Sequence, residues 1–146
     1  MGLFSFLKEA GEKLFGGDEP SPAEKSEKLV KTVQALGLKA EGFEVVVEGD
    51  KAVIKGKALS QEEKEKIILA IGNTEGIGQV EDQFTVAEPK PDAVFYTVKK
   101  GDTLSAISKA HYGNPNKYNV IFEANKPMLK HPDKIYPGQV LRIPPL

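Results

Sequence analysis

The feature that most constrains the fold is the C-terminal segment of residues 96–144, in which signals for two strands and two helices follow one another closely. The sequence Tyr96-Thr-Val98 predicts a strand, and Gly101-Asp-Thr-Leu104 predicts a turn that leads into a helix. A second helix follows, and Pro137-Gly138 predicts the turn into a final strand. A β-α-α-β unit of this kind leaves the preceding part of the chain to form a separate unit.

This order of elements resembles a LysM module, a fold that usually binds N-acetylglucosamine polymers outside the cytoplasm. In a sugar-binding module of that family, the loop that starts the first helix and the stretch after the second helix flank the groove. The resemblance therefore implies a candidate glycan groove at Gly101, Asp102, Thr103, Leu104, Asn125 and Pro127. Peptidoglycan contact would require export of the chain.

Composition limits both the size and the chemistry of the protein. The chain has 146 residues, enough for one ordinary domain or two small ones, and no cysteine, which excludes disulfides and thiolate chemistry. Residues 1–92 carry 12 Lys against 18 Asp and Glu, whereas residues 93–146 carry 8 Lys and Arg against 3 Asp and Glu. The two halves could therefore attract each other, although two separately solvated surfaces would give the same counts. No basic run is dense enough to predict a nucleic-acid partner.

The N-terminal residues 2–15 space their apolar side chains along one helical face, which predicts a short amphipathic helix. Such a helix could lie on a membrane, but its charges balance, and this favours docking on the protein's own core. The segment lacks the order of a secretory signal peptide, and no apolar run approaches the length of a transmembrane helix. We therefore expect a cytoplasmic protein, and a monomer.

Two helix starts and a hairpin are readable in the middle of the chain. Ser21-Pro-Ala-Glu24 and Ser60-Gln-Glu-Glu63 are capping boxes, in which the serine hydroxyl accepts a hydrogen bond from the first helical turn. Two β-branched runs within residues 43–56 flank Gly49-Asp50, where glycine permits a positive φ, and they predict a β-hairpin.

The helix that starts at Ser60 is expected to stop at Gly72-Asn73, and a further strand is expected over residues 77–86. The resulting order of helix, strand, strand, helix and strand over residues 22–87 resembles a BON domain. BON domains occur mostly in bacterial envelope proteins and are associated with phospholipid surfaces. We therefore expect an α+β protein of two small domains. The expected segments are an N-terminal helical segment with its break (1–20), a BON domain (21–87), a linker (88–94) and a LysM domain (95–146).

The sequence offers little for catalysis. His111 and His131 lie in different elements, and no third ligand of metal-binding type accompanies them. Ser105 and Ser108 have helical context without a nucleophile elbow, and the charged residues 62–66 predict a solvated helix face. We therefore expect a binding protein rather than an enzyme.

A glycine-rich turn follows the second helix of the middle unit. Gly72, Gly76 and Gly78 let the backbone fold tightly at a helix C-terminus, where carbonyl oxygens lack intrahelical partners and the helix dipole is negative. Several neutral carbonyls aimed at one point suit a large monovalent cation such as potassium, whereas calcium and magnesium normally require carboxylates. A Schellman-type helix stop would use the same glycines without binding an ion.

The whole chain resembles the bacterial potassium-binding protein family, in which a short N-terminal segment, a BON domain and a C-terminal LysM domain occur in one cytoplasmic protein. The matching motifs include Gly2-Leu-Phe4, Ile68-Leu-Ala-x-Gly72-Asn73 and Gly101-Asp-Thr-Leu-Ser-Ala-Ile-Ser108. The family holds potassium with main-chain carbonyls of its N-terminal segment and of the turn after the second BON helix. On this sequence the implied donors are Leu7, Lys8, Ala10, Gly72, Thr74 and Ile77.

The resemblance also implies how the protein acts. Cation size would give selectivity, so that potassium, rubidium and caesium bind and sodium does not. Ion binding would order the N-terminal segment and tighten the packing of the two domains, which is the behaviour of a potassium sensor or buffer. A peptidoglycan-binding LysM module and a phospholipid-associated BON protein are the alternative functions.

Overall fold

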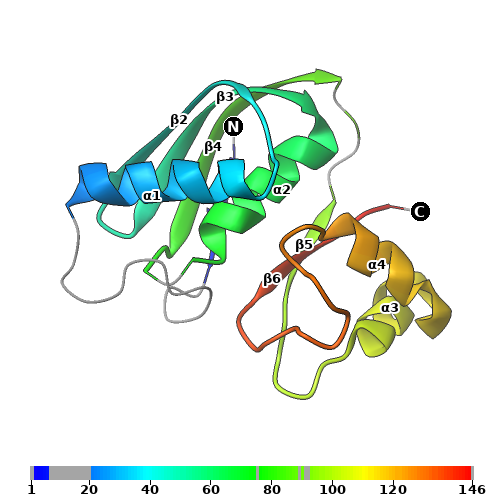
Figure 1. Cartoon of the computed structure of the whole chain (residues 1–146). Helices are drawn as coiled ribbons and strands as arrows, with labels where there is room; N and C mark the ends of the chain where they lie inside the picture. The colour runs from blue at the N-terminus through cyan, green and yellow to red at the C-terminus, as the bar shows by residue number, and fades with distance from the viewer. Residues whose placement is uncertain (1, 7–20, 75, 89, 91–92, 146) are drawn as a thin grey trace.

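The computed structural model describes residues 2–6, 21–74, 76–88, 90 and 93–145, and it contains a four-stranded sheet and a two-stranded ribbon with their helices (Figure 1). The first unit comprises β1 (Gly2–Ser5), α1 (Pro22–Ala35), β2 (Glu41–Glu48), β3 (Lys51–Ser60), α2 (Gln61–Gly72) and β4 (Gln79–Glu88). The second unit comprises β5 (Val94–Thr97), α3 (Leu104–Tyr112), the 3-10 helix η1 (Pro115–Lys117), α4 (Tyr118–Ala124) and β6 (Val140–Ile143). The α+β class and the predicted orders α-β-β-α-β and β-α-α-β are confirmed.

Both capping serines begin their helices as predicted. Ser21 accepts the Glu24 amide at 3.3 Å, and Ser60 accepts the Glu63 amide at 3.1 Å. Each hydroxyl thereby satisfies one of the free donors of the first helical turn. The Glu63 carboxylate accepts the backbone amide of Lys39 at 2.7 Å, so it ties the connection between α1 and β2 to the start of α2.

The helix predicted for residues 2–15 is wrong at its start, because residues 2–5 form the strand β1. This strand pairs antiparallel with β4, with Phe4 opposite Val80. Alternate residues of a strand share a face, so Phe4 and Phe6 pack on the core while Leu3 is 57% exposed. The open edge of β4 supplies backbone partners that a helix at this position would leave unused. Residues 7–15 of the predicted helix lie outside the described residues.

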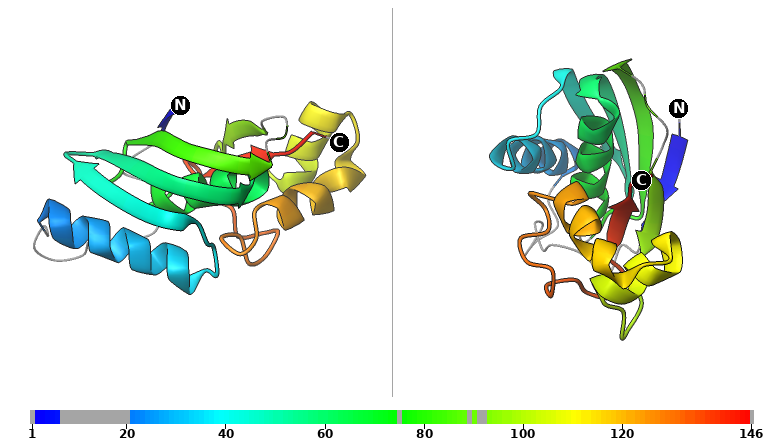
Figure 2. Two further views of the ribbon diagram at one scale, coloured as in Figure 1. Left: turned by 90° about the horizontal axis from the view of Figure 1, so that it is seen from above. Right: turned by 90° about the vertical axis from the view of Figure 1, so that its right-hand side faces the viewer.

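The sheet of the first unit has the strand order β1-β4-β3-β2, in which β3 and β4 are parallel and the other pairs are antiparallel. The helix α2 provides the crossover that a parallel pair requires. Figure 2 shows α1 and α2 on the same face of this sheet. Between the helices and the sheet, Leu29, Ile54, Ile67 and Val80 are completely excluded from solvent. The core of the first unit therefore lies on one face of the sheet.

The second unit has its own small core and also shares the core of the first unit. Its buried cluster consists of Val98, Leu104, Ile107, Ile121, Leu129, Leu141 and Ile143. Val140 of β6 instead belongs to the cluster of the first unit, and Phe95 and Met128 pack against that cluster. The rings of Phe4 and Phe95 approach to 4.9 Å between centroids. The two units are therefore packed together through α2, β1 and β6, and the linker is not their only connection.

Candidate functional site

The C-terminal end of α2 holds the predicted ion ligands of the first unit. Gly72 is the last helical residue, and Asn73 caps the helix. Thr74 donates twice to the helix, from its amide to the Ile71 carbonyl at 3.3 Å and from its hydroxyl to the Ala70 carbonyl at 3.1 Å. These bonds satisfy carbonyls one turn back and hold the chain close to the helix end.

The carbonyls of the three predicted ligands in this turn differ in their partners. The Thr74 carbonyl accepts the Ile77 amide at 3.1 Å, which occupies one of its two lone pairs. No hydrogen bond reaches the carbonyl of Gly72 or of Ile77 from any other residue that the structure describes. Gly72 and Thr74 lie at the negative end of the α2 dipole, where a cation is favoured.

Packing around the turn fixes its backbone. The residues Thr74 and Ile77 are 2% and 0% exposed, and Gly76 has a φ of 99°, a value that glycine adopts without strain. Gly78 accepts the Phe6 amide at 2.8 Å and donates into the β2–β3 hairpin at 2.8 Å. The positions of the turn carbonyls are therefore set by buried neighbours and not by flexible side chains.

The N-terminal strand reaches the same end of α2 through Phe6. This residue is 8% exposed, and a β-carbon built on Gly72 would come within 2.1 Å of its ring. Glycine at this position is therefore required for the ring to lie flat against the helix. Phe6 directly precedes Leu7 in the sequence; the predicted ligands Leu7, Lys8 and Ala10 lie outside the described residues.

Asn73 joins the α2 turn to the second unit. Its side-chain nitrogen donates to the Val140 carbonyl at 2.8 Å, and its side-chain oxygen accepts the Val140 amide at 2.8 Å. The amide group thereby satisfies backbone groups of β6 that would otherwise need another partner. The residue that caps α2 is thus also a bridge between the two units.

A buried ion pair joins the same helix to the second unit. Arg142 donates to Glu65 Oε1 from Nε at 3.1 Å and from Nη2 at 2.8 Å, and the two side chains are 8% and 4% exposed. The other carboxylate oxygen of Glu65 accepts the Ala93 amide at 2.9 Å, and Arg142 also donates to the Ala124 carbonyl at 3.2 Å. The solvated helix face predicted at residues 62–66 is therefore wrong at Glu65, because the second unit covers this position.

Two residues of the predicted glycan groove are buried. Leu104 is 3% exposed and belongs to the core of the second unit. Asn125 is 2% exposed, and its side chain donates to the backbone carbonyls of Ile121 and Arg142 and accepts the Arg142 amide. Both side chains therefore stabilise the second unit and are not presented to a ligand.

The other four groove positions lie at the surface or are partly exposed: Gly101, Asp102, Thr103 and Pro127. Asp102 accepts the Tyr96 hydroxyl at 2.6 Å and the Lys99 amide at 2.8 Å. The hydrogen bond from the Tyr96 hydroxyl, and to a smaller extent that from the Lys99 amide, holds the pKa of the Asp102 carboxyl below its usual value. The bond between Tyr96 and Asp102 also raises the pKa of the Tyr96 hydroxyl. Asp102 is therefore already engaged in fixing the turn before α3, and Thr103 caps that helix.

Two further kinds of functional feature are absent from the described ranges. No group of three His, Cys, Asp or Glu side chains comes together there to hold a metal ion. No helix in these ranges is both long and apolar enough to cross a membrane. His111 lies in the last turn of α3, where a cation would complement the helix dipole. Its ring meets that of Tyr96 edge-on at 5.3 Å between centroids.

The residues that join the two units were missed by sequence reasoning. Asn73 was interpreted only as part of a helix stop, and Glu65 as part of a solvated face. One signal could have been used, because Arg142 is the only arginine of the sequence and stands within an apolar strand. An arginine in such a position needs a buried partner.

Comparison with known proteins identifies the two units and the chain as a whole. Residues 25–88 match the BON domain family, and residues 96–144 match the LysM domain family. The potassium binding protein Kbp of Escherichia coli O6:H1 is 53% identical over 147 residues, covering 99% of this chain and 99% of that protein.

Two further relatives match only part of the chain. An uncharacterized protein of Deinococcus radiodurans is 49% identical over 49 residues, which cover 34% of this chain and 19% of that protein. The uncharacterized protein YqbP of Bacillus subtilis is 41% identical over 58 residues, which cover 34% of this chain and 26% of that protein. The identity that extends over nearly the full length of both chains is decisive: the chain belongs to the family of the potassium binding protein Kbp.

Proposed function

We propose that the protein binds potassium at the C-terminal end of α2 and acts as a cytoplasmic potassium sensor or buffer. The observation that carries the proposal is the relationship over 99% of the chain to a protein named for potassium binding. The α2 turn supports the location, because the carbonyls of Gly72 and Ile77 have no hydrogen-bond donor among the described residues. The remaining ligands would come from the N-terminal segment, which follows the docked residue Phe6.

The proposed cage uses backbone oxygens of Gly72, Thr74 and Ile77 together with those of Leu7, Lys8 and Ala10. Neutral carbonyls replace the hydration shell of a large, weakly hydrated cation, so potassium, rubidium and caesium are accepted. Sodium loses more hydration free energy than such oxygens return. Because the ligands are peptide oxygens, a change of side chain that preserves the turn should preserve ion binding.

Potassium binding would also favour the docked arrangement of the two units. Asn73 lies between the proposed ligands Gly72 and Thr74, and its side chain is paired with Val140 of the second unit. An ion that orders this turn therefore stabilises the contact with β6. By mass action the stabilisation of the ion-bound state reaches about 2.7 kcal/mol at a hundredfold excess of ion over its dissociation constant.

A titration with two matched variants tests the proposal. Potassium-free protein is titrated with potassium chloride and, as a control, with sodium chloride, and backbone amide signals are followed by NMR. We expect saturation with potassium only, with shifts concentrated at residues 72–77. Thr74→Ser, which keeps the backbone and the hydroxyl that donates to the Ala70 carbonyl, should retain binding. Gly76→Ala should weaken it, because the φ of 99° strains any other residue.

Two results would contradict the proposal. Equal responses to potassium and sodium would show that the observed shifts report ionic strength and not a selective site. Unchanged potassium affinity in Gly76→Ala, with the fold intact, would mean that this turn does not hold the ion.

A further inference from the structure

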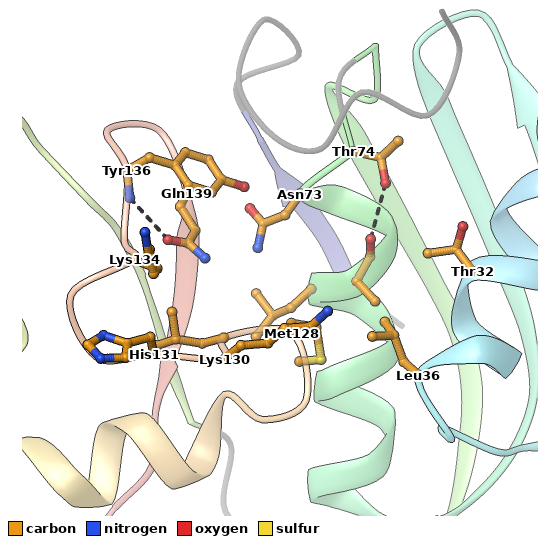
Figure 3. Close-up of a pocket in the computed structure, with 13 residues that line it drawn as sticks. Thr32, Leu36, Asn73, Thr74, Met128, Lys130, His131, Lys134, Tyr136 and Gln139 are labelled. Carbon is orange, nitrogen blue, oxygen red and sulfur yellow. Dashed lines mark hydrogen bonds between the residues drawn. The ribbon is translucent and has the colours of Figure 1, made fainter.

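A pocket of about 740 Å³ lies between the two units (Figure 3). Helices α1 and α2 form one wall, and the segment of residues 128–139 between α4 and β6 forms the other. Small organic ligands typically occupy pockets of about 300–1,000 Å³. Asn73 and Thr74 lie at its edge, but their side chains are already hydrogen-bonded to Val140 and Ala70.

The floor of the pocket is apolar. Leu69 and Leu129 are almost fully buried, and Leu36 and Met128 are half-buried at the two walls. In Figure 3 Leu36, which caps the C-terminal end of α1, projects from one wall and Met128 from the opposite segment. A flexible thioether adapts its shape to the body of a ligand. This surface suits an apolar group that enters between the units.

The charge of the pocket has one sign. Its lining includes Lys130, His131 and Lys134, and none of its described lining residues is Asp or Glu. Neither lysine has an ion-pair partner among the residues that the structure describes. The nearby Asp133 carboxylate lies 3.8 Å from His131 Nδ1 and its side chain is 90% exposed. Among the described lining residues, the pocket therefore presents positive charge that no carboxylate neutralises.

A compact turn at residues 131–134 carries His131 and Lys134. The Asp133 amide donates to His131 Nδ1 at 3.2 Å, and the Lys134 amide donates to the His131 carbonyl at 3.0 Å. Since Nδ1 accepts a hydrogen bond, the neutral imidazole carries its proton on Nε2 and can donate from there. Lys130, His131 and Lys134 thus supply donors to an anion along one short segment that lines the apolar pocket.

We propose that this pocket binds a small organic anion, with an apolar ring or chain against Leu36 and Met128 and a carboxylate, sulfonate or phosphate group at Lys130 and Lys134. The ligand bridges the two units, so its binding stabilises their docked arrangement. The proposal does not rest on ion binding, because none of these four residues is a predicted potassium ligand.

The test uses the full chain and the fluorescent aromatic sulfonate 8-anilinonaphthalene-1-sulfonate. The uncharged N-phenyl-1-naphthylamine, which has the same rings without the sulfonate, is the control ligand. The test variant Lys130→Glu/Lys134→Glu reverses two exposed charges at the pocket. The matched control Lys100→Glu/Lys117→Glu makes the same change of net charge at exposed lysines that do not line it.

We expect saturable binding of one sulfonate per chain, with amide shifts at Leu36 and Met128. The pocket variant should weaken the sulfonate about tenfold, because two favourable contacts become repulsive, and the control variant should change it by less than about twofold. Equal weakening by both variants, equal affinity for the uncharged control ligand, or no saturable binding would each overturn the proposal.

Discussion

Substitution of Gly72 by alanine should separate the N-terminal strand from α2. A β-carbon at this position would come within 2.1 Å of the Phe6 ring, and all three of the closest atoms belong to that ring. The helix backbone cannot retreat easily, because its residues 67–71 are buried in the core. The ring must therefore leave its place, and Phe6 loses its burial.

The expected cost follows from two opposing terms. Exposure of a buried phenylalanine side chain costs about 1.5–3 kcal/mol. Alanine is preferred over glycine in a helix by up to about 1 kcal/mol, and less at the last helical residue. Gly72→Ala should therefore lower the free energy of unfolding by about 1–2 kcal/mol, and it should weaken potassium binding if the N-terminal segment supplies ligands.

A double-mutant cycle in urea, followed by circular dichroism at fixed potassium concentration, isolates this contact. In the Phe6→Ala background the methyl group meets no ring, so Gly72→Ala should be neutral or slightly stabilising. The reasoning fails if Gly72→Ala has the same cost with and without the Phe6 ring, since the cost would then come from α2 itself.

Three further perturbations test the contacts between and within the units. Glu65→Gln should lower the free energy of unfolding by about 3–5 kcal/mol, because it leaves a buried guanidinium without its counter-charge, whereas the exposed Glu62→Gln should cost less than about 0.5 kcal/mol in the same thermal denaturation. Asn73→Ala should lower the free energy of unfolding by about 2 kcal/mol, because two backbone groups of β6 lose their partners. Small-angle scattering should then detect a less compact chain. Unchanged scattering and unchanged stability would contradict the role of Asn73 as a bridge between the units. The Tyr96 hydroxyl keeps the pKa of Asp102 low in the folded state, so the ionised carboxylate stabilises the fold. This contribution is present above the carboxyl's unfolded pKa and is lost as the pH falls through its folded pKa. In a pH series of urea titrations, Asp102→Asn should remove this loss of stability at acid pH.

The elements with local signals could be predicted from the sequence. A serine hydroxyl that caps a helix contacts a residue three positions away in the sequence. Ser21 and Ser60 therefore predict the starts of their helices from local sequence alone. The hairpin likewise depends on Gly49, which has a φ of 63°. These signals predicted the order of elements from α1 to α2 in the first unit.

The contacts that position the candidate site could not be predicted in this way. Asn73 and Val140 are 67 residues apart, and Glu65 and Arg142 are 77 residues apart, so no local pattern links either pair. The strand β1 was mistaken for a helix because a short apolar run fits both periods, and only the free edge of β4 distinguishes them.

The most direct test of the proposed cage is a crystal grown in rubidium chloride with no potassium, measured at the rubidium absorption edge. The account predicts one strong anomalous peak at the C-terminal end of α2, in direct contact with the carbonyl oxygens of Gly72, Thr74 and Ile77. A well-ordered crystal with no peak there, or with its strongest peak on side-chain carboxylates elsewhere, would contradict a backbone-carbonyl cage at this turn.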